Sequence, residues 1–130
     1  MLSYLVIGAV DVEASARFYD AILLPQGYEK GGEPQHYCYS LPGTADKSNG
    51  PGSIHIARPF DHQPATYGNG MMLAFRMSSR AMVDALYTAG LANGGTDEGP
   101  PGIRDIYPDD FYVAYLRDPT GNKMAVFFTG

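Results

Sequence analysis

The stretch Arg117-Asp118-Pro119-Thr120-Gly121-Asn122-Lys123 predicts a tight turn between two apolar segments. Proline suits the second position of such a turn because its ring fixes φ, and Gly121 supplies the positive φ that a later position needs. The flanking segments, Phe111 to Arg117 and Asn122 to Phe128, are rich in aromatic and apolar residues. Together they predict an antiparallel hairpin near the C-terminus.

The residues before this hairpin predict a strand, a helix and a further strand. Met71 to Met77 is typical of an apolar strand, and Ser78 or Ser79 can cap the helix that follows. Glycines after that helix end it before a short strand near Gly95 to Glu98. The segment from Gly99 to Asp109 is expected to be a loop.

The first half of the chain predicts the same order of elements. Leu2 to Gly8 favours a strand, and Asp11 is a suitable N-cap for a helix that runs to about Leu24. Proline and glycine at positions 25 to 27 stop this helix. Three further strands are expected, near Tyr28 to Lys30, Gln35 to Leu41 and Ser53 to Arg58.

An offset of 68 residues superposes these two halves, placing Ile7 on Phe75, Asp11 on Ser79 and Tyr19 on Tyr87. We therefore predict an α+β fold in which a βαβββ unit occurs twice within one domain, residues 1–130. The units cover about residues 1–60 and 70–130. Each helix should cover one face of a mostly antiparallel sheet and leave the other face free. Two free faces could enclose a cavity.

Composition excludes several classes of function. With 9 Lys and Arg against 14 Asp and Glu the net charge is −5, and no basic stripe suited to nucleic acid is present. No apolar run approaches the roughly 20 residues of a membrane-spanning helix. Cys38 is the only cysteine, so no disulfide can form within the chain. No signal peptide is visible, and we expect a cytoplasmic protein.

Two motifs within this arrangement resemble the glyoxalase/bleomycin-resistance/extradiol-dioxygenase superfamily, also called the vicinal oxygen chelate superfamily. The first is Ile7-Gly8 leading into Asp11-x-Glu13-x-Ser15-x-x-Phe18-Tyr19-Asp20, and the second is the turn from Arg117 to Lys123. The resemblance spans nearly the whole chain. Both motifs are markers of the fold and carry no catalytic residues.

The resemblance implies that members with metal chemistry carry His, Glu or Gln ligands on the first and last strands of each unit. Strand alternation assigns four matching cavity-facing positions, with Leu5, Ile7, Ile54 and Ile56 facing the helix instead. A single imidazole cannot hold a catalytic divalent ion, so we predict no metal centre of the superfamily type and no cofactor. The four positions are Tyr4, His55, Met72 and Ala125.

Three of these residues allow a functional and a structural interpretation. His55 could be a general base or hydrogen-bond donor, or a structural histidine satisfied by a neighbour. Tyr4 could offer its hydroxyl to a ligand or simply be a strand aromatic. Met72 is favoured as cavity lining because a thioether adapts to irregular space.

Other candidate ligand-binding residues are Arg58, Arg104, Tyr107 and Tyr112. The arginines and Tyr107 could orient an anionic or aromatic guest, although each is more often a surface residue. Tyr112 and Tyr115 lie on opposite faces of one strand, so only one can line the cavity. Tyr37 and Tyr39 share a face and are expected to pack, while Cys38 is expected to be an inert buried thiol. The five acids between Asp97 and Asp110 are interpreted as a solvated loop.

We therefore expect a superfamily member that binds a small organic ligand without a transition metal, as a homodimer. If it has activity, His55 would carry the proton, with Tyr4 and Tyr112 hydrogen-bonding the guest, in isomerase or lyase chemistry. One alternative is a metal-dependent glyoxalase-type lyase or dioxygenase with unusual ligands. Another is sequestration of a cationic antibiotic, as the resemblance to bleomycin-resistance proteins implies.

Overall fold

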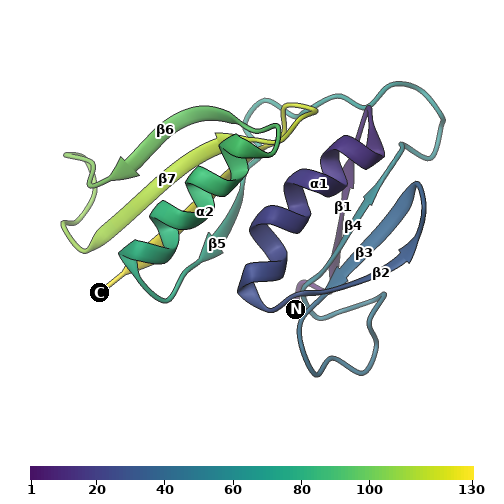
Figure 1. Cartoon of the computed structure of the whole chain (residues 1–130), viewed down its shortest axis with the longest axis horizontal. Helices are drawn as coiled ribbons and strands as arrows, with labels where there is room; N and C mark the ends of the chain where they lie inside the picture. Colours follow the sequence, from purple (N-terminus) through teal and green to yellow (C-terminus); the bar gives the residue numbers. More distant parts are fainter.

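A computed structural model describes all 130 residues and contains two units of the same order (Figure 1). Each unit has one helix and a four-stranded sheet, with one parallel and two antiparallel strand pairs. The predicted α+β fold with a repeated βαβββ order is therefore confirmed. Neither helix is long and apolar enough to cross a bilayer.

The first unit contains one helix, a short 3-10 turn and four strands in the sheet order β1-β4-β3-β2. Asp11 caps the helix through a 3.0 Å hydrogen bond that its carboxylate accepts from the Ala14 N–H. Gly27, with φ 94°, ends the 3-10 turn. The elements are β1 (Tyr4–Gly8), α1 (Val12–Leu23), the turn Leu24–Gln26, β2 (Glu29–Glu33), β3 (His36–Ser40) and β4 (Ser53–Ala57).

The second unit repeats this arrangement with the sheet order β5-β8-β7-β6. Of the two candidate caps, Ser79 is the one used, and its hydroxyl accepts from the Met82 N–H at 3.1 Å. The elements are β5 (Leu73–Arg76), α2 (Arg80–Ala92), β6 (Thr96–Gly102), β7 (Phe111–Arg117) and β8 (Lys123–Thr129).

The turn between β7 and β8 has the predicted chemistry. Arg117 pairs with Lys123 across the hairpin, and Gly121 has φ 109°. One oxygen of Asp118 accepts three backbone N–H groups, each at 2.9 Å, from the residues Thr120, Gly121 and Asn122. A compact Asx-type turn therefore closes the hairpin.

Strand β6 is longer than predicted, because it runs through Pro100 and Pro101 to Gly102. Prolines are tolerated here because β6 is an edge strand, and its register with β7 shifts between Asp97 and Gly99 and again before Gly102. Part of the expected loop therefore belongs to the sheet.

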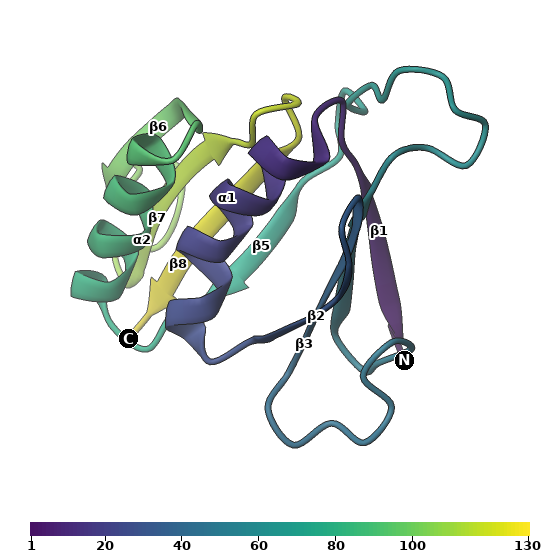
Figure 2. The ribbon, with the colours of Figure 1, turned by 45° about the vertical axis from the view of Figure 1, so that its right-hand side comes forward.

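The two helices lie next to each other, with α1 against the first sheet and α2 against the second, and the sheets occupy opposite halves of the molecule (Figures 1 and 2). Gly90 of α2 allows this close approach, since a Cβ there would lie 2.5 Å from the Leu116 Cδ1 and 3.2 Å from the Phe18 ring. The helix-facing strand positions are the predicted ones: Ile7, Ile54 and Ile56 are buried. No helix covers the opposite face of either sheet, so these open faces carry the candidate sites.

Candidate functional site

The open face of the second sheet carries a groove of about 760 Å³, which we call the Tyr115 groove. Strands β6, β7 and β8 form its floor, and the segments 68–72 and 104–107 form its rim. Its lining combines aromatic, thioether and charged side chains, among them Met72, Glu98, Arg104, Tyr107, Tyr115 and Lys123.

Strand pleating decides which side chains reach this groove. On β7, Ala114 and Leu116 are fully buried, whereas Tyr115 and Arg117 line the groove. Ala125 pairs directly with Tyr115 on the neighbouring β8. Gly99 of β6 leaves space for the guanidinium above the sheet, because a Cβ there would lie 3.1 Å from both Arg104 Nη2 and the Tyr115 ring.

The charges in the groove are unevenly paired. The groove contains three cationic and two carboxylate side chains. One salt bridge forms among them, in which Arg117 Nε donates to Glu98 at 2.7 Å. Arg104 and Lys123 form no salt bridge. Their charged groups lie 5.7 Å and 5.2 Å from the centre of the Tyr115 ring. Tyr115 is therefore an aromatic surface with two unpaired cations beside it.

Burial, followed by the neighbouring Tyr107 phenol, raises the pKa of Tyr115, against a smaller opposing effect of the Arg104 guanidinium. The phenol therefore stays protonated at neutral pH. A protonated phenol can donate a hydrogen bond to a ligand in the groove.

Three of the residues expected to bind a ligand lie together in this groove: Met72, Arg104 and Tyr107. Tyr112, also expected to bind a ligand, does not line the groove, because its side chain lies on the helix-covered face. Its hydroxyl donates to Asp84 of α2 at 2.6 Å, and Arg80 lies 5.0 Å from its ring centre. Tyr115 occupies the open face instead, as alternation requires once Tyr112 faces the helix.

Sequence reasoning missed Lys123 and Arg117 as groove residues. Both belong to the turn motif, where their neighbours were assigned to turn formation alone. Their position at the paired ends of β7 and β8 could have signalled a shared face, because directly opposed residues of an antiparallel pair point to the same side. Arg58, by contrast, follows β4, is exposed, and does not line the groove.

His55 lies on the open face of the first sheet, in a separate pocket of about 290 Å³ that His36 and Cys38 also line. Its Nε2 lies 2.7 Å from the Ser48 carbonyl oxygen, and its Nδ1 lies 2.9 Å from His36 Nε2. Because a carbonyl only accepts, Nε2 carries the proton, and Nδ1 accepts from His36. Both ring nitrogens therefore have partners. The Tyr4 ring packs edge-on, 5.5 Å from the His55 ring centre.

These residues do not fit the metal that the fold family implies. Tyr4 and His55 lie on the first sheet, whereas Ala125 lies on β8 of the second sheet and Met72 directly precedes β5. Cys38 and His36 approach opposite nitrogens of His55, so the three cannot converge on one ion. No group of three or more His, Cys, Asp or Glu residues has the arrangement of a metal site.

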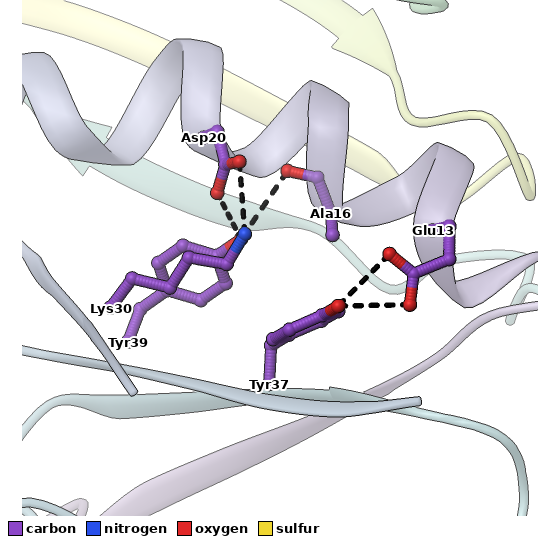
Figure 3. A network of polar contacts seen from close by, with 6 residues as sticks. All are labelled: Glu13, Ala16, Asp20, Lys30, Tyr37 and Tyr39. Carbon is purple, nitrogen blue, oxygen red and sulfur yellow. Dashed lines mark hydrogen bonds and ion pairs between the residues drawn. The ribbon is translucent and has the colours of Figure 1, made fainter. Parts of the chain in front are cut away.

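The remaining tyrosines of the first sheet face α1 (Figure 3). The Tyr37 hydroxyl donates to Glu13 at 2.9 Å, and the Tyr39 hydroxyl donates to Asp20 at 2.6 Å. Lys30 forms a 3.0 Å ion pair with the same Asp20. Tyr37 and Tyr39 therefore hold the helix on the sheet. Cys38 points the other way, and burial raises the pKa of its thiol, as expected for an unreactive cysteine.

Solved structures similar to the whole chain include a glyoxalase/bleomycin resistance protein from Albidiferax ferrireducens T118. It is 39% identical, with 100% of this chain and 99% of that chain covered and a TM-score of 0.82. A glyoxalase-related enzyme from Fulvimarina pelagi is 22% identical over 99% of this chain and 88% of its own, with a TM-score of 0.74.

The fosfomycin resistance protein FosX from Mesorhizobium loti is 12% identical, covers 100% of this chain and 92% of its own, and has a TM-score of 0.70. The likeness to the last two proteins concerns the fold alone. No protein-family model and no curated protein matches the sequence.

Proposed function

Since the chain belongs to the glyoxalase/bleomycin resistance/dioxygenase superfamily, we propose that it binds a small organic ligand in the Tyr115 groove without a transition metal. One observation carries this proposal: the groove joins a concave volume of about 760 Å³ to an aromatic floor and a few polar groups. Sites for small molecules combine these properties.

The alternatives have less support from the residues present. A metal-dependent lyase or dioxygenase needs three or four converging ligands, and only His55 among the four matching positions is an ordinary one. Sequestration of a cationic antibiotic needs a negative groove, whereas cations outnumber carboxylates here. Binding of an organic ligand needs neither feature.

We also propose that the protein is a homodimer. Val6 on the open face of the first sheet is 62% exposed, and Met71 at the rim of the groove is 67% exposed. A second copy that covers these apolar side chains would remove them from water. Neither proposal assigns a catalytic role to His55.

Binding can be tested by screening organic compounds for thermal stabilisation and then measuring their dissociation constants by calorimetry. Tyr115→Ala should weaken binding by about tenfold, because a ligand loses the ring on which it would stack. Tyr112→Ala is the matched control, since it removes a tyrosine from the opposite face of the same strand. Equal effects of the two substitutions, or no ligand at all, would contradict the proposal.

The absence of a metal centre has its own test. Elemental analysis of tag-free protein should find far less than one transition-metal ion per chain, with no change on His55→Ala. About one ion per chain that is lost in His55→Ala would refute the metal-free proposal.

A further inference from the structure

We infer that the Tyr115 groove takes an organic anion, with a carboxylate or phosphate head beside Lys123 and Arg104 and a flat apolar body on Tyr115. This inference rests on the proposed function and adds the chemical class of the ligand.

The charge of the groove is opposite to that of the chain as a whole. The chain carries −5, yet the groove gathers three cations against two carboxylates. Glu98 is already engaged by Arg117 at 2.7 Å. Asp105, the other carboxylate of the groove, forms no salt bridge with Lys123 or Arg104. An incoming anion could therefore pair with either cation.

The two unpaired cations are placed around one ring. Both lie within 6 Å of the Tyr115 ring centre. A ligand in contact with that ring would therefore lie close to both cations. An anionic head there could accept charge-assisted hydrogen bonds from the ammonium or the guanidinium.

Arg104 is anchored to the backbone. Its Nη2 donates to the Pro100 carbonyl at 2.6 Å, which leaves other N–H groups of the guanidinium to donate elsewhere. Gly99 and Gly102 make room for it, since Cβ atoms there would lie 3.1 Å from Nη2 and 3.3 Å from Nη1. A guanidinium seated against two glycines loses less freedom on binding a ligand than a mobile surface arginine does.

The rest of the lining suits an apolar body. Met72 and Ile106 line the groove, and each exposes a large part of its apolar side chain. Thioethers adapt to ligands of varied outline. The Tyr107 phenol adds a polar tip beside Tyr115. The groove therefore pairs a cationic edge with an apolar wall, which matches an amphipathic anion.

The experiment compares naphthoate, naphthyl phosphate and the neutral isostere naphthamide by calorimetry at low and high salt. At least one of the two anions should bind about tenfold or more tightly than naphthamide, and its affinity should fall as salt rises. Comparing the two anions distinguishes a carboxylate site from a phosphate site.

The matched variants are Lys123→Gln, Arg104→Gln and the control Arg80→Gln, which removes a cation beside Tyr112 on the covered face of the same sheet. Each groove variant should weaken anion binding about tenfold, and Arg80→Gln should leave it unchanged. Lys123→Arg, which keeps the charge, should retain most of the affinity. Circular dichroism melts confirm that every variant is folded.

If naphthamide binds as tightly as both anions, and Tyr115→Ala abolishes its binding, the anion assignment is overturned while the proposed function stands. Anion binding that Lys123→Gln and Arg104→Gln leave unchanged would overturn the anion assignment as well. If none of the three probes binds, the anion assignment is overturned. The wider compound screen with Tyr115→Ala then decides the proposed function separately.

Discussion

Asp118 shows how one side chain can serve both a turn and the packing of two units. One oxygen holds the turn, and the other accepts the buried Tyr19 hydroxyl of α1 at 2.7 Å and the Asn122 amide at 2.9 Å. The Asn122 amide also donates to the Gly8 carbonyl of β1 at 3.1 Å. The turn thus fastens the second unit to the start of the first, near the beginning of α1 (Figure 2).

Asp118→Ala should therefore lower the free energy of unfolding by about 2–3 kcal/mol, because several buried donors lose their acceptor. Denaturant unfolding measures this change. Tyr19→Phe removes one of these hydrogen bonds and should cost only about 1 kcal/mol. A loss for Asp118→Ala no larger than that for Tyr19→Phe would show that the turn tolerates the missing carboxylate.

The buried tyrosines also predict a response to alkaline pH. Burial, followed by the Asp118 carboxylate, raises the pKa of Tyr19, and burial together with Asp20 raises the pKa of Tyr39. Above the ordinary value of about 10, the unfolded chain loses these protons while the folded chain keeps them. Stability is therefore complete below pH of about 10 and should fall as pH rises beyond it.

Unfolding free energies measured on both sides of that pH test this response. Tyr39→Phe should make the decline shallower, because one titrating group is removed. The exposed Tyr67→Phe is the control and should leave the slope closer to that of the original chain. An equally steep decline in Tyr39→Phe would argue against this origin.

At the scale of elements, helix propensity and side-chain packing have opposite requirements at Gly90. Alanine is favoured over glycine in a helix by about 1 kcal/mol. Its Cβ would, however, lie 2.5 Å from a methyl of Leu116, which is fully buried and cannot move aside freely. Overpacking costs about 1–3 kcal/mol, so the clash outweighs the gain in helix propensity.

Gly90→Ala should therefore lower the free energy of unfolding by about 1–2 kcal/mol. Combining it with Leu116→Val should recover part of that loss, since the clashing methyl is removed, and a double-mutant cycle measures the coupling. The exposed Thr88→Ala in the same helix serves as the control and should be neutral or stabilising. A stabilising Gly90→Ala would mean that the helices can separate at little cost.

For the molecule as a whole, the proposed homodimer predicts self-association in solution. Light scattering after size-exclusion chromatography should give twice the mass of one chain. Val6→Arg places a charge on the exposed apolar face and should weaken the dimer about tenfold or more. The control Thr88→Arg introduces the same charge on an exposed helix position. A monomer at all concentrations, or equal effects of both variants, would contradict the homodimer.

Local chemistry determined much of this protein from sequence alone. The turn at Asp118 to Gly121, the caps at Asp11 and Ser79, and the alternation that buries Ile54 and Ile56 all depend on neighbours within a few residues. Because these signals occur in both halves of the chain, they were enough to predict the order of elements, and the resemblance to the superfamily implied the family fold. They also grouped Met72, Arg104 and Tyr107 as candidate ligand-binding residues, though without placing them together.

Tertiary structure alone decided which residues line the groove. Alternation separates the residues on the two faces of a strand, but it does not tell which face a helix covers and which face is open. Because Tyr112 packs against α2, Tyr115 faces the groove on the other side of the strand. Lys123, on the other strand of the hairpin, lies next to the Tyr115 ring. The contact of His55 with His36 depends on how β3 and β4 pair within the first sheet. The hydrogen bond between Tyr19 and Asp118 joins residues far apart in the chain and depends on how the two units pack, which no local pattern encodes.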